Sequence, residues 1–194
     1  LVPFLGNHDT TRFLGEPGAT VERLKQAFVT LTTMRGMPQL YSGDEIAMRG
    51  AEDPDNRRDF PGGFAGRANA FTAAGRSPEQ EEMFAWVKSL LKLRASRTEL
   101  LSGEEQIVKA TGGVMAFVRG SELSDGCSAE RQRVLVVINN GFKPQKIEIP
   151  TENTGLEGCR GTELLWGKAA EVTLNSGKLR VEVGARQTLV VAVR

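Results

Sequence analysis

The stretch LVPFLGNHDTTRF, residues 1–13, decides which fold this sequence predicts. Its apolar run ends at Gly6, and Asn7, His8 and Asp9 follow directly. His8 is the only histidine in the protein. Polar residues directly after a strand are typical of the functional edge of a parallel α/β sheet. A turn closed by Asn and Asp side chains explains them equally well, so both interpretations stay open.

Strand-like and helical patterns alternate over the first hundred residues. Apolar residues recur at helical spacing over 21–34 after Thr20, a good N-cap, and a short strand-like run follows at 38–41. Ser77, with proline next and glutamine three residues on, predicts the start of a second helix over 78–101. This β-α-β-α order implies parallel strands. Two strands do not form a stable parallel sheet alone, so we expect the end of a larger α/β architecture.

The remainder, from about residue 106, predicts strands and turns only. Apolar and polar residues alternate on both sides of a Ser-Gly turn near residue 176, which indicates a hairpin with one buried face. The strand-like runs are 114–118, 133–138, 145–149, 171–174, 178–183 and 188–193. They predict a small antiparallel β-sandwich. The polar stretch 121–133 is expected to be a long, mobile hairpin loop.

Composition and charge exclude several classes of partner. The net charge is +1, from 25 basic and 24 acidic residues, which argues against nucleic acid or an anionic membrane. No window approaches the roughly 18–20 apolar residues of a membrane span, and no signal peptide is visible. The chain begins inside a strand-like run without Met, so we expect a piece of a longer protein or a mature product.

The two cysteines, Cys127 and Cys159, lie outside any C-x-x-C unit, and one histidine cannot complete a usual zinc site. Two free thiols are the favoured interpretation. A single disulfide in an exported protein is the alternative.

Two further polar stretches are candidate sites. EDPDNRRDF, residues 52–60, combines four carboxylates with two arginines. It predicts either a solvated loop with mutual salt bridges or a wall that binds a polar ligand, since carboxylates and guanidinium groups together suit sugar hydroxyls. GDE, residues 43–45, could turn the chain or bind a metal, and we favour the turn.

Two motifs together resemble one family. FLGNHDTTRF, residues 4–13, resembles the last conserved region of the α-amylase family, glycoside hydrolase family thirteen. GMPQLYSGDEIAMRG (36–50) followed by DPDNRRDFPGGF (53–64) resembles its strand-eight region, in the form typical of neopullulanases, cyclomaltodextrinases and maltogenic amylases. The resemblance implies α/β followed by all-β: the last βα units, with strands seven and eight, of a TIM-type (β/α)8 barrel in 1–103, and a C-terminal antiparallel β-sandwich domain in 104–194.

The resemblance also implies roles for individual residues. Asp9 matches the third catalytic carboxylate, which stabilises the transition state, and His8 matches a histidine that hydrogen-bonds the same sugar. Asp53 and Arg57 match a pair that binds the neighbouring glucose. The implied reaction is hydrolysis, with retention, of glucosidic bonds in maltodextrins, cyclodextrins or pullulan; α-1,4 bonds are expected, and α-1,6 bonds are left open. No cofactor and no metal site are implied for these residues.

Retaining glycosidases need a nucleophile and an acid/base carboxyl, and in this family both follow strands four and five. Neither region is present among these residues, so we expect the 194-residue chain alone to be inactive. The expected partners are a maltooligosaccharide or other α-glucan and the remaining part of the parent barrel. Association between copies through exposed barrel surface is a further expectation. The motif form favours a periplasmic or extracellular parent, with the cytoplasm as the alternative.

Three competing functions are weighed against the glycosidase. A non-catalytic, amylase-like carbohydrate-binding or accessory module is the main alternative, although both sugar-contacting motifs are intact. Trp166 and Phe142 could stack on starch, but packing on the β core is favoured. A metal hydrolase that uses His8, Asp9 and the acids of the GDE turn is disfavoured, because a second ligand motif is missing.

Overall fold

A computed structural model describes residues 1–128, 131–175 and 177–194 of the chain. These residues form two compact units. Unit 1 comprises Leu1–Thr32 and Met37–Lys92, and unit 2 comprises Thr33–Gly36 and Leu93–Arg194. The assignment of 1–103 to one family domain and 104–194 to another stays a prediction.

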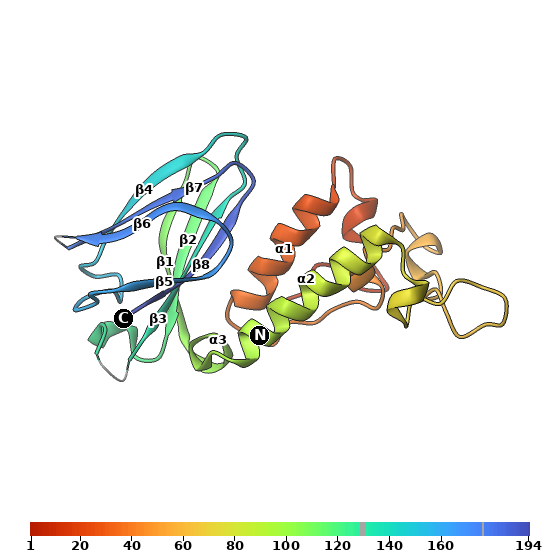
Figure 1. Ribbon diagram of the computed structural model, residues 1–194, viewed down its shortest axis with the longest axis horizontal. Helices are drawn as coiled ribbons and strands as arrows, with labels where there is room; N and C mark the ends of the chain where they lie inside the picture. The colour runs from red at the N-terminus through yellow and green to blue at the C-terminus, as the bar shows by residue number, and fades with distance from the viewer. Residues whose placement is uncertain (129–130, 176) are drawn as a thin grey trace. The chain divides into compact units, whose positions relative to one another are not determined.

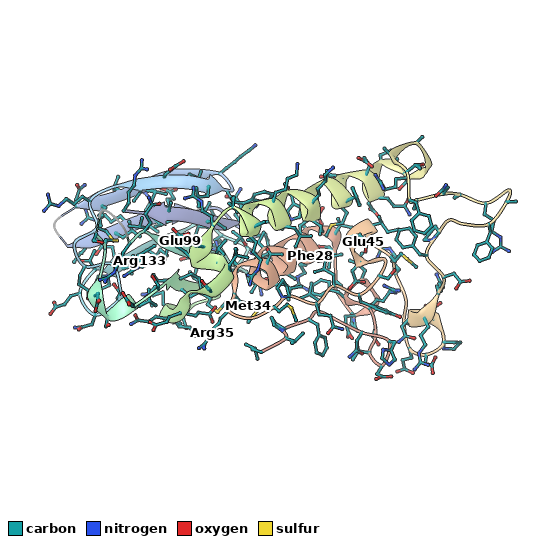
Figure 2. The ribbon with its side chains drawn as sticks, turned by 90° about the horizontal axis from the view of Figure 1, so that it is seen from below. Phe28, Met34, Arg35, Glu45, Glu99 and Arg133 are labelled. Carbon is teal, nitrogen blue, oxygen red and sulfur yellow. A yellow bond between two sulfur atoms is a disulfide. The ribbon has the colours of Figure 1, made fainter. Side chains whose placement is uncertain are left out.

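The first helix, α1, spans Val21–Thr33 as predicted. Thr20 caps it, because its Oγ1 accepts a hydrogen bond of 3.2 Å from the backbone N–H of Arg23. Leu24 and Phe28 on the apolar face are buried, each with 1% of its surface exposed; Figure 2 labels Phe28 on this helix. The helix is therefore held in unit 1 by the face that its spacing predicts.

The second helix, α2, spans Pro78–Ala95 and begins with the predicted capping box. The Ser77 N–H donates to the Gln80 side chain at 2.9 Å, and the Gln80 N–H donates to Ser77 Oγ at 3.3 Å. The helix lies beside α1 (Figure 1), where Trp86 Nε1 donates to the Lys25 carbonyl at 3.2 Å. The expected continuation to residue 101 is wrong, because the backbone of Arg97 is extended. A separate short helix, α3, spans Thr98–Ser102.

The two strands predicted in unit 1 form a single parallel bridge between Phe4 and Gln39 rather than a ladder. The Met37 N–H donates to the Leu1 carbonyl at 3.1 Å, and the Gln39 N–H donates to the Pro3 carbonyl at 2.9 Å. The parallel direction is thus as predicted. The pairing stays short because no other strand lies beside these segments among the described residues, and isolated strand pairs are marginal. Four 3₁₀ turns complete the unit: Phe13–Gly15, Asp44–Ile46, Asp55–Arg57 and Ala73–Gly75.

Unit 2 is the predicted antiparallel sandwich, and Figure 1 shows its two sheets as separate layers. One sheet has the order β1-β2-β3-β8-β5 and the other has the order β4-β7-β6. The strands are β1 Glu104–Thr111, β2 Val114–Gly120, β3 Arg133–Asn139, β4 Gln145–Pro150, β5 Thr162–Trp166, β6 Ala169–Asn175, β7 Lys178–Val183 and β8 Thr188–Val193. Alternate residues of both sheets, such as Ile149, Leu179 and Val191, form one buried core. The strands β1 and β5 were not among the predicted runs.

The connection between β2 and β3 is anchored by its side chains. Leu123, in a 3₁₀ turn at Leu123–Asp125, belongs to the sandwich core. Cys127 and Cys159 form a disulfide, with their Cα atoms 4.9 Å apart. The prediction of two free thiols is therefore wrong, because the fold brings together two residues 32 positions apart. Residues 129 and 130 of the expected mobile loop lie outside the described part of the chain.

A buried arginine, Arg119 on β2, binds several main-chain carbonyls of unit 2. Its Nε donates to the Glu104 carbonyl at 2.9 Å, and one Nη donates to the Gly103 carbonyl at 3.1 Å. Its other Nη donates to the carbonyl of Thr33, the last residue of α1. Burial lowers the pKa of Arg119 to about 10, and these carbonyls compensate for its lost hydration. Thr33, at the end of α1, therefore belongs to unit 2 and accepts a hydrogen bond from Arg119 there.

Candidate functional site

The loop that follows the first apolar run presents His8 and Asp9 to solvent. The Asn7 side chain accepts a hydrogen bond from the Asp9 N–H at 2.8 Å, and Thr10 Oγ1 accepts one from the Asn7 N–H at 3.0 Å. His8 Nε2 lies 3.4 Å from Asp9 Oδ2, and both side chains are 67% exposed. The local turn is thus present, and it leaves both functional groups free to meet a ligand.

Arg57 connects this loop to the second polar stretch. One Nη lies 3.5 Å from Asp9 Oδ1, and Nε lies 3.4 Å from Asp53 Oδ1. The same Nε donates to the His8 carbonyl at 2.8 Å. Asp9, Asp53 and the main-chain carbonyl of His8 therefore lie around the guanidinium group of Arg57, although the two segments are more than forty positions apart.

The second stretch also contains the local salt bridge that the sequence offered as the alternative. Asp55 pairs with Arg58 three residues on. The Ala51 N–H donates to Asp55 Oδ2 at 2.8 Å. That backbone N–H, with a smaller contribution from Arg58, lowers the pKa of Asp55. The salt-bridged loop is therefore present at Asp55 and Arg58, and the wall that binds a polar ligand stays a prediction for Asp53 and Arg57.

Beneath the exposed groups lies a buried ion pair that the sequence did not predict. Arg12 is 2% exposed, and its Nη1 lies 2.9 Å from Asp44 Oδ1. Its guanidinium also stacks 4.3 Å from the ring centroid of Tyr41. Burial raises the pKa of Asp44 to about 6, and the charge of Arg12 opposes that rise. Arginine is seldom buried, so the sequence gives no reason to expect Arg12 inside the protein. Its partner, Asp44, stands out only as an acid of the GDE turn.

Asn56, which the sequence also left without a role, ties the two loops together. It is 1% exposed, and its Nδ2 donates to the carbonyls of His8 and Thr10, each at 2.9 Å. Arg12 Nε donates to the Asn56 carbonyl at 2.9 Å. The buried layer therefore holds the backbone on both sides of Asp9.

Two glycines allow this close approach. If residue 15 had a Cβ, that atom would overlap the carbonyl oxygen of Gly50. If residue 50 had a Cβ, that atom would lie only 2.7 Å from the carbonyl oxygen of Asp55. Gly43 has a φ of 99° and begins the 3₁₀ turn at Asp44–Ile46. The preference for a turn at GDE is confirmed.

The remaining candidates are placed differently. Asp44 is buried against Arg12 while His8 and Asp9 are exposed. Over 1–128, 131–175 and 177–194, no group of three or more His, Cys, Asp or Glu could hold a metal ion. Phe142 is 83% exposed, with Arg186 stacked 4.2 Å from its ring centroid, so the expectation that it packs on the core is wrong.

None of the helices described in the structure is long and apolar enough to cross a membrane.

The exposed site suits a polyol. Carboxylate oxygens of Asp9 and Asp53 accept hydrogen bonds, and the imidazole of His8 and the guanidinium of Arg57 donate them. Vicinal hydroxyls of a sugar need both kinds of partner within a few ångströms. The arrangement therefore has the donors and acceptors that hydrogen-bonding to a saccharide beside Asp9 would need.

Comparison with known proteins gives a consistent result. Residues 1–94 match the family described as the catalytic domain of alpha amylase. An amylopullulanase from Thermoanaerobacter thermohydrosulfuricus is 32% identical over 199 aligned residues, covering 93% of this chain and 12% of that protein. A maltogenic α-amylase from Bacillus acidopullulyticus is 30% identical over 185 residues, covering 92% of this chain and 27% of that protein. The chain thus spans only a small part of the length of these relatives.

Solved structures agree in fold. The chain resembles an Anoxybacillus α-amylase with a TM-score of 0.71 and 28% identity, over 99% of this chain and 37% of that one. It resembles an α-amylase from Geobacillus thermoleovorans with a TM-score of 0.74 and 25% identity, over 100% of this chain and 39% of that one. The expected family and fold class are confirmed.

Proposed function

Because residues 1–94 belong to the α-amylase catalytic-domain family, we propose that this chain supplies part of the active site of a retaining glycosidase. The proposed substrates are α-glucans, namely maltodextrins, cyclodextrins or pullulan, cleaved at α-1,4 glucosidic bonds, with α-1,6 bonds as the alternative. An amylopullulanase and a maltogenic α-amylase among the relatives support this class. The remainder of the parent barrel is the proposed partner of this chain.

We assign Asp9 the stabilisation of the positive charge that develops on the sugar at the transition state. His8 hydrogen-bonds the same sugar, and Asp53 and Arg57 bind the neighbouring glucose. The observation that carries this proposal is the position of Arg57 between the two carboxylates, 3.5 Å from Asp9 and 3.4 Å from Asp53. An arginine that holds both loops can align two adjacent sugars on one surface.

The decisive experiment uses a protein that joins this chain to the family's nucleophile and acid/base regions. Asp9→Asn is expected to lower kcat by more than about 10²-fold, as for other lost charge-stabilising groups. Arg57→Ala is expected to act mainly on KM. Asp59→Asn, an exposed carboxylate of the same loop, is the matched control and leaves both constants unchanged. A normal kcat in Asp9→Asn would refute the assignment, whereas a joined protein that keeps Asp9 and binds maltotetraose without cleaving it would favour a non-catalytic binding module.

A polypeptide of these 194 residues alone is expected to be inactive. Retaining hydrolysis needs two carboxyls about 5 Å apart, one as nucleophile and one as acid/base, and Asp9 cannot serve as both. Incubation with maltotetraose and detection of released reducing ends is the test. Turnover that survives purification to homogeneity and disappears in Asp9→Asn would contradict the proposal.

We also propose that the parent works outside the cytoplasm, in the periplasm or extracellular space. The disulfide between Cys127 and Cys159 supports this compartment, because such bonds persist in oxidising surroundings.

A further inference from the structure

One buried side chain, Asn56, binds the backbone on both sides of Asp9. Asn56 Nδ2 donates to the carbonyls of His8 and Thr10, each at 2.9 Å. These two residues flank Asp9 in the sequence. The amide therefore binds the peptide group that precedes Asp9 and the one between Thr10 and Thr11, and no hydrogen bond joins it to the carboxylate itself.

Asn56 is itself held in place by a hydrogen bond from Arg12 to its main-chain carbonyl. Arg12 Nε donates to its carbonyl at 2.9 Å, and Arg12 Nη1 pairs with Asp44 at 2.9 Å. Arg12 and Asn56 are almost completely buried, at 2% and 1% exposure. A guanidinium with two fixed partners has one orientation, so the Asn56 backbone is held in one place.

We propose that Asn56, locked by Arg12 and Asp44, is a positioning residue that sets Asp9 against Arg57. The next residue along the chain, Arg57, donates from Nε to the same His8 carbonyl at 2.8 Å. One carbonyl thus receives both the buried amide and the exposed guanidinium, which couples the position of the loop to the sugar-binding arginine. The consequence for catalysis rests on the proposed function; the positioning itself does not.

A purely structural role for Asn56 would affect stability and leave the site unchanged. The chain offers a matched residue for this comparison. Asn139 in unit 2 is also fully buried, and its Nδ2 donates to the carbonyls of Lys143 and Gly184, each at 2.8 Å. Asn139→Asp and Asn56→Asp replace the same two-carbonyl donor by a carboxylate, and only Asn56 contacts the site. The two amides differ at Oδ1, which in Asn139 accepts from the Gly141 N–H at 2.9 Å and in Asn56 is buried without a partner among the described residues.

The imidazole of His8 provides the readout, because the protein has one histidine. The 194-residue chain, labelled with ¹³C in histidine, gives one Cε1–H signal by NMR. We expect Asn56→Asp to displace that signal and to broaden it, since a carboxylate would then face two carbonyl oxygens. Arg12→Lys keeps the charge opposite Asp44 but loses the Nε donor, and a smaller displacement is expected. Asn139→Asp is expected to leave the signal unchanged.

An unchanged His8 signal in folded Asn56→Asp would overturn the proposal. If that variant does not fold, the wild-type chain decides: the Asn56 side-chain NH₂ is expected to exchange slowly with D₂O, and fast exchange would overturn the proposal. Titration with maltotetraose tests the proposed function separately. A His8 signal that responds to Asn56→Asp but not to the sugar supports positioning and contradicts saccharide binding by this chain.

Discussion

The disulfide between Cys127 and Cys159 should account for much of the stability of unit 2. It closes a loop with a sequence separation of 32. In the chain-entropy description, a loop of this length restricts the unfolded state by about 12 cal/mol/K, or about 4 kcal/mol at 25 °C. Measured values for native bridges fall at about 2–5 kcal/mol. Removing the bridge by Cys127→Ser with Cys159→Ser should therefore cost a large part of the usual margin of about 5–15 kcal/mol.

Urea unfolding followed by tryptophan fluorescence measures this loss. In a Trp86→Phe background, Trp166 on β5 is the remaining tryptophan and reports on unit 2. With a urea dependence of about 2 kcal/mol/M, the midpoint should fall by about 2 M. Reduction of the wild type should reproduce the shift, whereas the reductant should not affect the double serine variant. Equal midpoints for the oxidised protein and the double variant would refute the reasoning.

Three other perturbations test the description of unit 1. Ser77→Ala should lower the free energy of unfolding by about 1 kcal/mol through loss of the α2 cap, measured by thermal denaturation. The raised pKa of Asp44, about 6, means that the folded state binds a proton that the unfolded state releases. The stability of the wild type relative to Asp44→Asn should therefore be highest below about pH 4 and fall as the pH rises through 6. Leu1, Phe4 and Met37 are 86%, 48% and 68% exposed, so self-association should appear in light scattering and diminish in Phe4→Ser with Met37→Ser.

Each of these predictions has a clear contrary result. An unchanged melting temperature in Ser77→Ala would mean that the cap contributes nothing. A stability difference independent of pH for Asp44→Asn would mean that folding does not change the pKa of that carboxyl. A monomer at all concentrations would show that the exposed apolar residues do not drive association.

The predictable parts of the fold are those in which local chemistry decides. Thr20 and Ser77 form the caps that their residue types favour, and the alternation in β7 predicts its buried face. The missed strands β1 and β5 are the two edges of their sheet. Edge strands are less buried, as Ile107 on β1 shows with 60% exposure, so they lack the apolar alternation on which the prediction depends.

The residues of the candidate site also fall into a group that the sequence predicts and a group that it does not. His8, Asp9, Asp53 and Arg57 stand out because polar groups at the ends of apolar segments, in motifs that resemble a family, point to a ligand. The buried layer below them gives no such signal, since a polar side chain in a loop is ordinarily expected to be solvated. Only the tertiary approach of the two loops shows that Asn56 is buried. The pairing of Cys127 with Cys159 likewise depends on which segments the fold brings together.

The position of Arg119 limits which residues of this chain could be transferred as a unit to another protein. Because its guanidinium binds the carbonyl of Thr33, together with those of Gly103 and Glu104, the sandwich uses a piece of backbone from the far end of α1. A fusion protein that carried only residues 104–194 would lack the carbonyls of Thr33 and Gly103 as acceptors for Arg119. A portable version of the sandwich therefore needs residues 93–103 and a substitute for the Thr33 carbonyl.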